Sequence, residues 1–397
     1  MIMDPMHMLF LGIAKHTFKI WTSMDIINTS HFAILQDRVN KLITPSTLGR
    51  IPLKIGSGFA QLTADQWKNW ICIFSPYCLF GILPQQDWLC WWLFVRACHI
   101  ICKKTISLSE CRQAQTFIVE YCKQFETLYG KETLVINMHL ACHLEACILD
   151  YGPANQFWCF GFERFNGILG SYPNNHQNVS VTMMKKFEDY LQSSDYDNVN
   201  TEFKQLLTDI SSSNNATGSL IVDIRKNSLL KPLREYILPH EYHKQLMNFY
   251  SDLYSNVSVV SAIITRSAKI SYMGHILSST LSRSKSGTCI AASSEPSNDK
   301  PRVGLVQFYF EHTIEMNSKD RVIQKMALVQ WFKVHPDRDK VLQPPLEIWE
   351  QTFVSLGKYN FLPIKKILYP LAFTLDKLNT SFGNETVVVT TPIFHIS

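Results

Sequence analysis

Two stretches in the second half of the chain decide the fold class: "VGLVQFYFEHTIEM" at 303–316 and "RVIQKMALVQWFKV" at 321–334. Both are rich in β-branched and aromatic residues, and apolar and polar residues alternate through much of each. Two further runs of this kind follow, "YNFLPIKKILYPLAFTL" at 359–375 and "ETVVVTTPIF" at 385–394. The pattern predicts a small antiparallel β barrel or sandwich over residues 262–397.

The first half of the sequence has a helical period instead. In "ISLSECRQAQTFIVEYCKQFETLYG" (106–130), Ser107 and Glu110 have the spacing of a capping box, an apolar stripe follows, and Gly130 provides a stop signal. This stretch predicts an amphipathic helix. The first 190 residues therefore read as mainly helical, and the chain as a whole as α+β.

A second helix start precedes a proline. Thr63 and Gln66 repeat the capping-box spacing, and Pro76 is expected to end the helix that begins there. The following segment, 88–104, is apolar on nearly every side. Such a pattern predicts a central buried helix.

Polar stretches of short side chains suggest where the chain is divided. "SSSNNATGS" at 211–219 and the serine-rich segment 278–302 are typical of surface connections, and residues 221–254 between them have a helical pattern. The predicted organisation is a helical region, a linker with connecting helices and a β-rich domain, over residues 1–190, 191–261 and 262–397.

Composition places the chain among globular proteins. Of its 397 residues, 46% are apolar and 18% charged, which excludes a disordered chain and allows a substantial core. Residues 1–220 carry 17 Lys and Arg against 18 Asp and Glu, whereas residues 221–397 carry 21 against 15. Attraction to a polyanion is therefore expected to be mild and to come from the second half.

The basic residues around the serine-rich loop are candidates for contacting DNA phosphates. They are Arg283, Lys285, Lys300 and Arg302. Contacts that only neutralise phosphates predict weak, sequence-independent and salt-sensitive binding. The alternative is that these charges only keep the loop solvated.

The cysteines and the N-terminal segment favour an intracellular protein. Ten of the 11 cysteines lie between Cys72 and Cys159 on apolar helical stretches, which favours reduced, buried thiols. Asp4 occupies a place where a signal peptide needs positive charge. The most apolar run, 88–102, is interrupted by Arg96 and is too short to cross a bilayer. A soluble chain without a membrane segment is expected.

The sequence "HLACH" at 139–143 contains a histidine pair that could bind a metal. A His-x3-His spacing on a helix places both imidazoles on one face, one turn apart. A zinc protease needs a glutamate directly after the first histidine, and Leu140 excludes that chemistry. The alternative is that His139 and His143 only fill a helical core.

Glu163 lies in the aromatic stretch "FWCFGFERFNG" at 157–167. Burying an unpaired carboxylate among such residues would be costly. One interpretation is a local ion pair with Arg164 or a surface position, and the other is a magnesium ligand presented on a helix whose aromatic flanks bury it.

An ordered set of segments resembles the transposases of CACTA (En/Spm-type) DNA transposons. In the first half these are "DPMHMLFLGIAKHTFKIW" (4–21), "IPLKIGSGFAQLTADQWKNWICIFSPYCLFGILP" (51–84), "HLACH" (139–143) and "FERFNGIL" (162–169). In the second half they are "VGLVQFYFEHTI" (303–314), "ALVQWFKVH" (327–335), "LEIWEQTF" (346–353) and "FLPIKKILYPLAF" (361–373). The resemblance covers nearly the whole chain in order and approximate spacing.

The resemblance implies a nuclear, DNA-acting protein with an RNase H-like catalytic core and a helical insertion. In such cores three acidic residues hold two Mg²⁺ or Mn²⁺ ions that activate a water or a 3′-hydroxyl. Glu163 matches the third acid, and Asp4 lies in a motif similar to the one near the second. His139 and His143 match half of a structural zinc site, whose other half, a Cys-x2-Cys pair, is missing from this sequence.

The same resemblance implies an incomplete catalytic centre. In the family the first strands and the first aspartate lie well upstream of the "DPMH" motif, which here begins at Asp4. One or two carboxylates cannot position two divalent ions, so no strand transfer is expected. Zinc is expected to bind weakly unless Asp4 and His7 converge on the histidine pair of residues 139 and 143.

Three functions therefore remain open at the level of sequence. The first is a truncated transposase remnant with residual DNA binding. The second is a chromatin or protein-interaction module in which an SH3-like or BAH-like domain carries an aromatic cage; the alternative is that these aromatic residues belong to a β core. The third is an active nuclease completed by missing upstream sequence or by a partner chain. Homo-oligomerisation is left open. The cage residues would be Phe308, Tyr309, Phe310 and Trp331.

Overall fold

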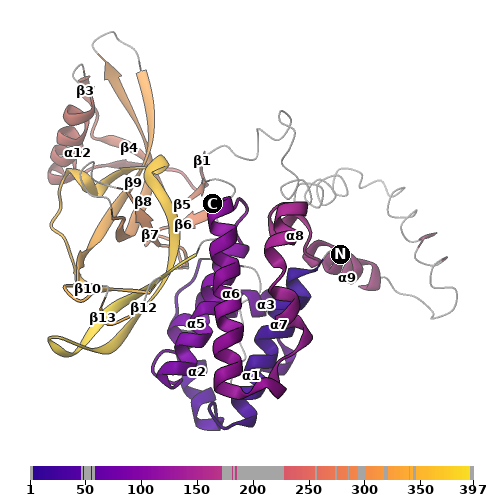
Figure 1. The fold of residues 1–397 in the computed structure, drawn as a ribbon. Coiled ribbons are helices and arrows are strands. Elements are labelled where there is room, and N and C mark those ends of the chain that lie inside the picture. Colours follow the sequence, from indigo (N-terminus) through magenta and orange to yellow (C-terminus); the bar gives the residue numbers. More distant parts are fainter. Residues whose placement is uncertain are drawn as a thin grey trace. The chain divides into compact units, whose positions relative to one another are not determined.

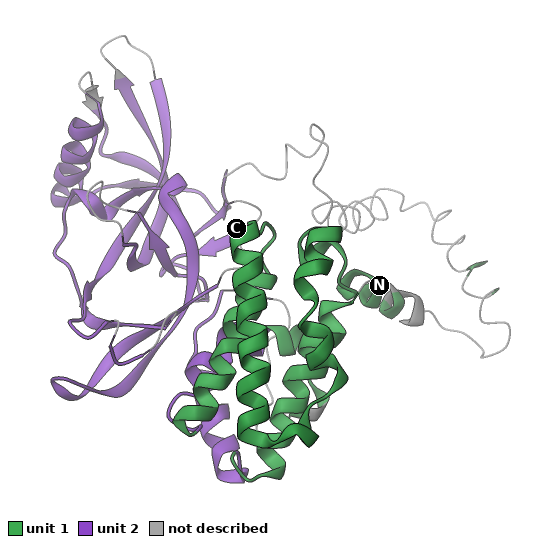
Figure 2. Cartoon of the chain, in the orientation of Figure 1, with its two compact units in different colours: residues 1–26, 59–68, 84–220 green, residues 27–58, 69–83, 221–397 purple. Residues whose placement is uncertain are grey.

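The computed structural model shows two compact units, each assembled from discontinuous segments (Figures 1 and 2). Unit 1 comprises residues 1–26, 59–68 and 84–220, and unit 2 comprises residues 27–58, 69–83 and 221–397. The structure describes residues 3–45, 48, 55, 59–171, 181, 184–185, 228–254, 257–272, 275–284, 286–293, 300–316, 321–338, 340–342 and 346–393.

The regular secondary structure of unit 1 within its described residues is all helical, with no strand there. The RNase H-like core that the resemblance implies is therefore not seen in this part of the chain. The longer elements are η1 (Met6–Ala14), α1 (Lys15–Ser23), α3 (Ala64–Asn69, of which Asn69 falls in unit 2), α5 (Gln85–Ile101), α6 (Leu108–Tyr129), α7 (Ile136–Ala141), α8 (Leu144–Tyr151) and α9 (Phe160–Ser171). Single turns of 3-10 helix are η2 (Phe59–Gln61), η4 (Lys131–Thr133) and η5 (Ala154–Gln156).

The helix predicted from Ser107 is confirmed as α6. The Ser107 hydroxyl accepts a hydrogen bond from the Glu110 backbone N–H at 3.3 Å, and the Ser107 N–H donates to the Glu110 carboxylate at 2.8 Å. Gly130 follows at a φ of 90°, a conformation that favours glycine. The central buried helix predicted for 88–104 is α5, whose apolar residues are buried on several sides.

Pro76 does not end the helical run that begins after Thr63, so that prediction is wrong. The run continues from α3 through a π-helical segment, η3 (Trp70–Phe74), into α4 (Ser75–Cys78). A wider turn directly before a proline accommodates the missing N–H and the ring that would otherwise clash with the preceding turn. The Ser75 hydroxyl donates to the Ile71 carbonyl at 2.9 Å and so satisfies a group near the irregularity.

The helical part of unit 2 is joined to its strands. Besides η3 and α4, it contains α2 (Thr29–Lys41), from which Arg38 donates to the carbonyls of Cys78 at 2.8 Å and Phe80 at 2.6 Å. The Tyr77 hydroxyl donates to the Asp376 carboxylate at 3.0 Å. These contacts hold the short helices against a long strand near the C-terminus.

Every strand pairing in the described residues is antiparallel, as predicted for the C-terminal half. The strands are β1 (Ser228–Leu229), β2 (Arg234–Ile237), β3 (Val257–Val260), β4 (Ile263–Ser267), β5 (Lys269–Tyr272), β6 (His275–Ser278), β7 (Cys289–Ala292), β8 (Arg302–Met316), β9 (Arg321–Val334), β10 (Glu347–Phe353), β11 (Phe361–Pro363), β12 (Ile367–Thr380) and β13 (Gly383–Pro392). The helical elements between them are α12 (His240–Leu253), η6 (Lys358–Asn360) and η7 (Ile364–Lys366).

Six strands of the larger sheet form a closed circuit of neighbours. Their order is β9-β10-β13-β12-β7-β8, and β8 pairs with β9 again. The smaller sheet has the order β1-β5-β6.

Two sequence predictions for unit 2 are wrong. The helix predicted over 221–254 is restricted to α12, because residues 228–229 and 234–237 form strands that pair with β5 and β4. Residues 221–227 lie outside the described residues. Strands therefore begin well before the predicted domain boundary at residue 262, and the other predicted boundary, at residue 190, also lies outside the described residues.

The aromatic cage is also absent. Phe308, Tyr309, Phe310 and Trp331 are each at most 8% exposed. Tyr309 and Trp331 belong to one core cluster of unit 2, and Phe308 and Phe310 to another. Both faces of β8 are buried, so alternation along the strand directs neighbouring rings into two cores rather than around one ligand.

No helix in the part of the chain that the structure describes is long and apolar enough to cross a membrane.

Candidate metal site

The motif "DPMH" forms the beginning of η1 in unit 1. Both oxygens of Asp4 accept backbone hydrogen bonds at 3.1 Å, Oδ1 from Met6 and Oδ2 from His7. The Pro5 ring has the φ that the start of a helix requires and lacks an N–H that would need a partner. The aspartate therefore caps the helix, which is a structural role for the residue that the resemblance places near the second acid.

Asp4 also connects η1 to a distant part of the chain. Its Oδ1 accepts a hydrogen bond of 2.9 Å from the backbone N–H of Cys159, a residue 155 positions away. Cys159 directly precedes α9, and its carbonyl accepts the N–H of Glu163 at 2.9 Å. This arrangement places the first turn of α9, with Glu163, beside the first turn of η1.

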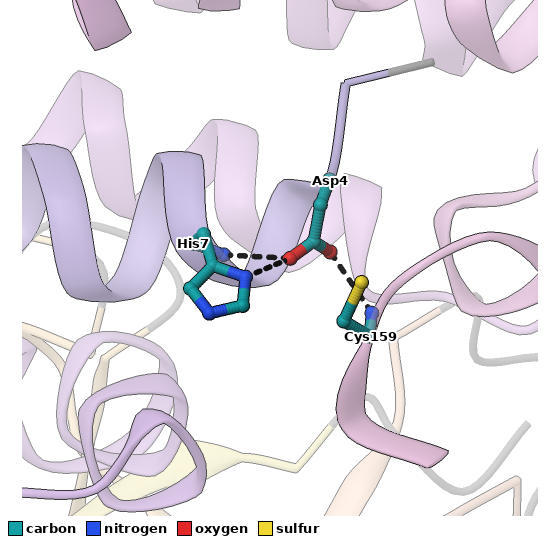
Figure 3. Close-up of side chains that lie close together, drawn as sticks. All are labelled: Asp4, His7 and Cys159. Atoms are coloured by element: carbon teal, nitrogen blue, oxygen red, sulfur yellow. Dashed lines mark hydrogen bonds and ion pairs between the residues drawn. The ribbon is translucent and has the colours of Figure 1, made fainter. Parts of the chain in front are cut away.

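Asp4, His7 and Cys159 lie close together at this junction (Figure 3). One potential ligand atom from each of the three lies within 4.8 Å of the other two. Among the described residues this is the group of three or more histidine, cysteine and acidic side chains that could hold a metal ion. It combines oxygen, nitrogen and sulfur donors, a set that divalent transition metals accept.

His7 is oriented by Asp4 towards Glu163. Its Nδ1 is hydrogen-bonded to Asp4 Oδ2, and its Nε2 lies 4.0 Å from Glu163 Oε1. A carboxylate that holds one imidazole nitrogen while the other faces a metal is a common arrangement in metal sites. The side chains of His7 and Glu163 are 53% and 56% exposed, so a hydrated cation can reach both. Ligand distances of about 2.1 Å would bring the two atoms to roughly 3.4 Å, a small movement from 4.0 Å.

Cys159 contributes less to metal binding than its position suggests. Burial raises the pKa of its thiol, and the nearby carboxylates of Asp4 and Glu163 raise it further. The thiol is therefore protonated at neutral pH, whereas a metal binds the thiolate. His7 and Glu163 are consequently the side chains of this site that face solvent without a thiol proton to lose, and Asp4 orients His7.

Glu163 is exposed, so the prediction that its aromatic flanks bury it is wrong. The neighbouring Phe162 is 71% exposed, and the side chain of Phe165 lies outside the described residues. An exposed position spares the carboxylate the cost of desolvation. It also leaves Glu163 free to bind ligands from solvent.

His139 and His143 lie one turn apart, at a junction between two helices. His139 is in the last turn of α7, and His143 is the N-cap residue of α8. Their exposed rings have centroids 5.0 Å apart at an interplanar angle of 73°. Neither belongs to a group of three potential ligands within the described residues, and the convergence of Asp4 and His7 on this pair is not seen there. Weak zinc binding by the pair stays a prediction.

Gly12 fixes the position of α7 against η1. A side-chain carbon at this glycine would come within 2.3 Å of the Asn137 amide nitrogen. The two helices therefore pack closely because residue 12 has no side chain.

The basic residues predicted to contact DNA lie in two segments of unit 2, one before β7 and one at the start of β8. Arg283 lies exposed between β6 and β7, Lys300 is exposed ahead of β8, and Lys285 lies outside the described residues. Arg302 begins β8, and its guanidinium lies 5.4 Å from the centre of the Trp331 ring.

Comparison of the chain with protein-family models, with curated proteins and with solved structures found no match.

Asp4, His7 and Glu163 were predicted as site residues from the sequence, whereas Cys159 was not. The signals for Cys159 were its place just before a helix and its proximity in sequence to Glu163. Neither signal identifies Asp4 as its partner, because their hydrogen bond closes a loop of 155 positions.

Proposed function

We propose that this chain is a transposon-derived protein of the CACTA type that binds one divalent cation through His7 and Glu163, with Asp4 holding His7 in place. It contacts DNA phosphates weakly in the nucleus and does not cleave or join DNA by itself. A complete DDE-type centre would need further carboxylates from other sequence or from a partner chain.

The observation that carries this proposal is the meeting of Asp4 and Glu163 on either side of His7. The resemblance matches Glu163 to the third acid of a catalytic centre and places Asp4 in a motif similar to the one near the second, although the two residues are far apart in sequence.

The number of carboxylates limits the chemistry. Two-metal phosphoryl transfer requires several carboxylates around ions about 3.5–4 Å apart. Of the two acids in this site, Asp4 already accepts two backbone hydrogen bonds as a helix cap. Glu163 is the one whose side chain is mostly exposed. One cation at this position neutralises phosphate charge but lacks the second ion that activates a nucleophile.

The closed circuit of six strands in unit 2 supports the SH3-like or BAH-like barrel that the sequence predicts. A chromatin-reading function through the four cage residues has no support from their burial. The barrel is therefore proposed as an architecture and not as a histone reader.

Manganese titration followed by electron paramagnetic resonance tests the cation site. The wild-type chain should bind about one Mn²⁺, and Glu163→Gln and His7→Gln should each weaken binding about tenfold or more. Glu241→Gln is the matched control, because Glu241 is an exposed acid in the first turn of α12. Equal Mn²⁺ binding by the wild type and by Glu163→Gln would refute the site.

Incubation of the chain with supercoiled plasmid and Mn²⁺ tests the expected lack of cleavage. We expect no nicking above the rate seen with the Glu163→Gln variant. Nicking that depends on Glu163 would instead show an active nuclease and would overturn the proposal of an inactive remnant.

A further inference from the structure

Unit 2 contains a cavity of about 420 Å³ beside the middle of β8, at the point along this strand where its pairing partner changes. Before this point β8 pairs with β7 at residues 302–305, and after it with β4 at residues 309–311. The cavity is open to solvent on one side and is lined by the N-terminal part of α12, by β2, β4, β8 and β9, and by the loops after β6 and β10. A volume in this range suits a small ligand or one end of a peptide.

A β-bulge directs a polar side chain into this cavity. The register between β8 and β9 shifts between Val306 and Phe308, so Gln307 is the extra residue. Gln307 lines the cavity, and its amide accepts a hydrogen bond from the Thr280 hydroxyl at 3.2 Å. Bulges commonly redirect a side chain beside a binding site.

Arg266 is the charged side chain among the residues that line the cavity. Its guanidinium lies 4.0 Å from the centre of the Tyr236 ring and 5.5 Å from that of Phe308. No carboxylate or hydrogen-bond acceptor for this guanidinium occurs among the described residues. The side chain is partly buried, so its N–H groups lose water on one side without gaining a protein acceptor.

The register places a second positive charge next to Arg266. Arg234 lies directly opposite it in the pairing of β2 with β4. Like charges in such cross-strand pairs repel each other. An anion bound to Arg266 would relieve this repulsion and would satisfy the unpaired guanidinium.

The geometry points to a binding site for a carboxylate attached to an apolar group. The guanidinium lies over a ring and still has N–H groups without an acceptor, and such a planar fork matches a carboxylate through two parallel hydrogen bonds. Leu281, Leu328 and Val354 provide apolar walls for the attached group, and Gln307 provides a further polar contact. Arg234 does not line the cavity, so Arg266 alone presents a positive charge to a ligand there, which favours a monoanion over a phosphate dianion. The ligand is a free organic acid or the C-terminal carboxylate of a peptide. The inference is independent of the metal site in unit 1.

Ligand-observed NMR titration with 3-phenylpropionate and its amide, 3-phenylpropionamide, tests the site. We expect the acid to bind at least tenfold more tightly than the amide. Arg266→Gln should abolish this preference, and Arg266→Lys should retain only part of it because the ammonium lacks the two-pronged geometry. Arg96→Gln is the matched control, since Arg96 also stacks on a ring, 4.0 Å from the centre of Phe117, but lies in unit 1.

A second variant separates binding from folding. Leu281 is 49% exposed at the cavity, so Leu281→Trp should fill it and exclude the acid with little effect on the thermal unfolding temperature. Equal binding of acid and amide by the wild-type protein, or unchanged binding by Arg266→Gln or Leu281→Trp, would overturn the inference.

Further titrations distinguish the sources of the carboxylate. A peptide ending in Phe with a free C-terminus should bind more tightly than its amidated form if the source is a peptide end. Preference for 3-phenylpropionate over that peptide would indicate a free acid. Phenyl phosphate binding more tightly than 3-phenylpropionate would overturn the choice of a monoanionic carboxylate.

Discussion

At the scale of single residues, Asp4 has a structural role and a chemical role at the same time. It caps η1 through two backbone N–H groups and connects this cap to Cys159, while its Oδ2 also orients His7. The Asp-Pro pair predicts a helix start from sequence alone. The orientation of His7 towards Glu163 could not be predicted, because it depends on the packing of two helices distant in sequence.

Tyr129 connects two other buried side chains of unit 1 by hydrogen bonds, and its substitution tests how much these bonds stabilise the fold. Its hydroxyl accepts from Trp21 Nε1 at 2.7 Å and donates to Asp87 Oδ1 at 2.6 Å. Tyr129→Phe leaves both partners buried without this oxygen, so we expect the free energy of unfolding to fall by about 2–3 kcal/mol. Urea unfolding followed by tryptophan fluorescence measures the change. Tyr151→Phe is the control, because Tyr151 is 42% exposed and should alter the stability little. A loss below about 0.5 kcal/mol for Tyr129→Phe would contradict a net contribution of these two hydrogen bonds to stability.

At the scale of elements, the sequence predicts best where the signals are local. The Ser107 and Thr63 caps identify α6 and α3, because a capping box involves residues only three positions apart. The strand β2 was missed because its partner, β4, lies almost thirty residues further on, and "REYI" carries no alternation of its own. Tertiary pairing therefore overrides the helical pattern of residues 234–237.

His312 links α12 to β8 and makes the stability of unit 2 depend on pH. Its Nε2 lies 2.8 Å from the Ser261 carbonyl, which can only accept, so Nε2 carries the proton. Its Nδ1 lies 3.2 Å from the Tyr250 hydroxyl oxygen, which also lies 3.1 Å from Met326 Sδ. Burial lowers the pKa of His312 below its ordinary value of 6.5; the Ser261 contact opposes this shift, and nearby His243 adds to it. The folded state thus favours the neutral ring, and its contribution to stability is complete above pH 6.5.

As the pH falls below 6.5, the unfolded chain gains a proton that folded His312 resists. The free energy of unfolding should therefore decrease by at most about 1.4 kcal/mol per pH unit until the folded pKa is reached. Thermal unfolding between pH 7.5 and pH 5 should show a smaller decrease for His312→Gln than for the wild type. His240→Gln, at an exposed position of α12, should behave like the wild type. An unchanged pH dependence in His312→Gln would assign the effect to other groups.

At the scale of the whole molecule, the sequence predicted an α+β chain with an antiparallel C-terminal half, and the structure confirms both features. It did not predict that residues 27–58 and 69–83 join the strands in one unit. That assembly depends on contacts such as the Tyr77–Asp376 hydrogen bond, which unites residues 299 positions apart. No local pattern around either residue indicates the other.

The uneven distribution of charge leads to the last prediction, on DNA binding. Residues 221–397 carry 21 basic against 15 acidic residues, and the side chains predicted to contact DNA number four, so few phosphates can be contacted together. With about two to four contacts, the affinity for duplex DNA should fall roughly 10- to 150-fold between 50 and 200 mM salt, whatever the DNA sequence. Fluorescence anisotropy with two unrelated duplexes measures both properties. Arg283→Gln should reduce the slope of log affinity against log salt by about 0.9, whereas Lys19→Gln, an exposed residue of α1 in unit 1, should leave it unchanged. Affinity that is independent of salt, or that differs strongly between the two duplexes, would show that base contacts rather than phosphate charge hold the DNA.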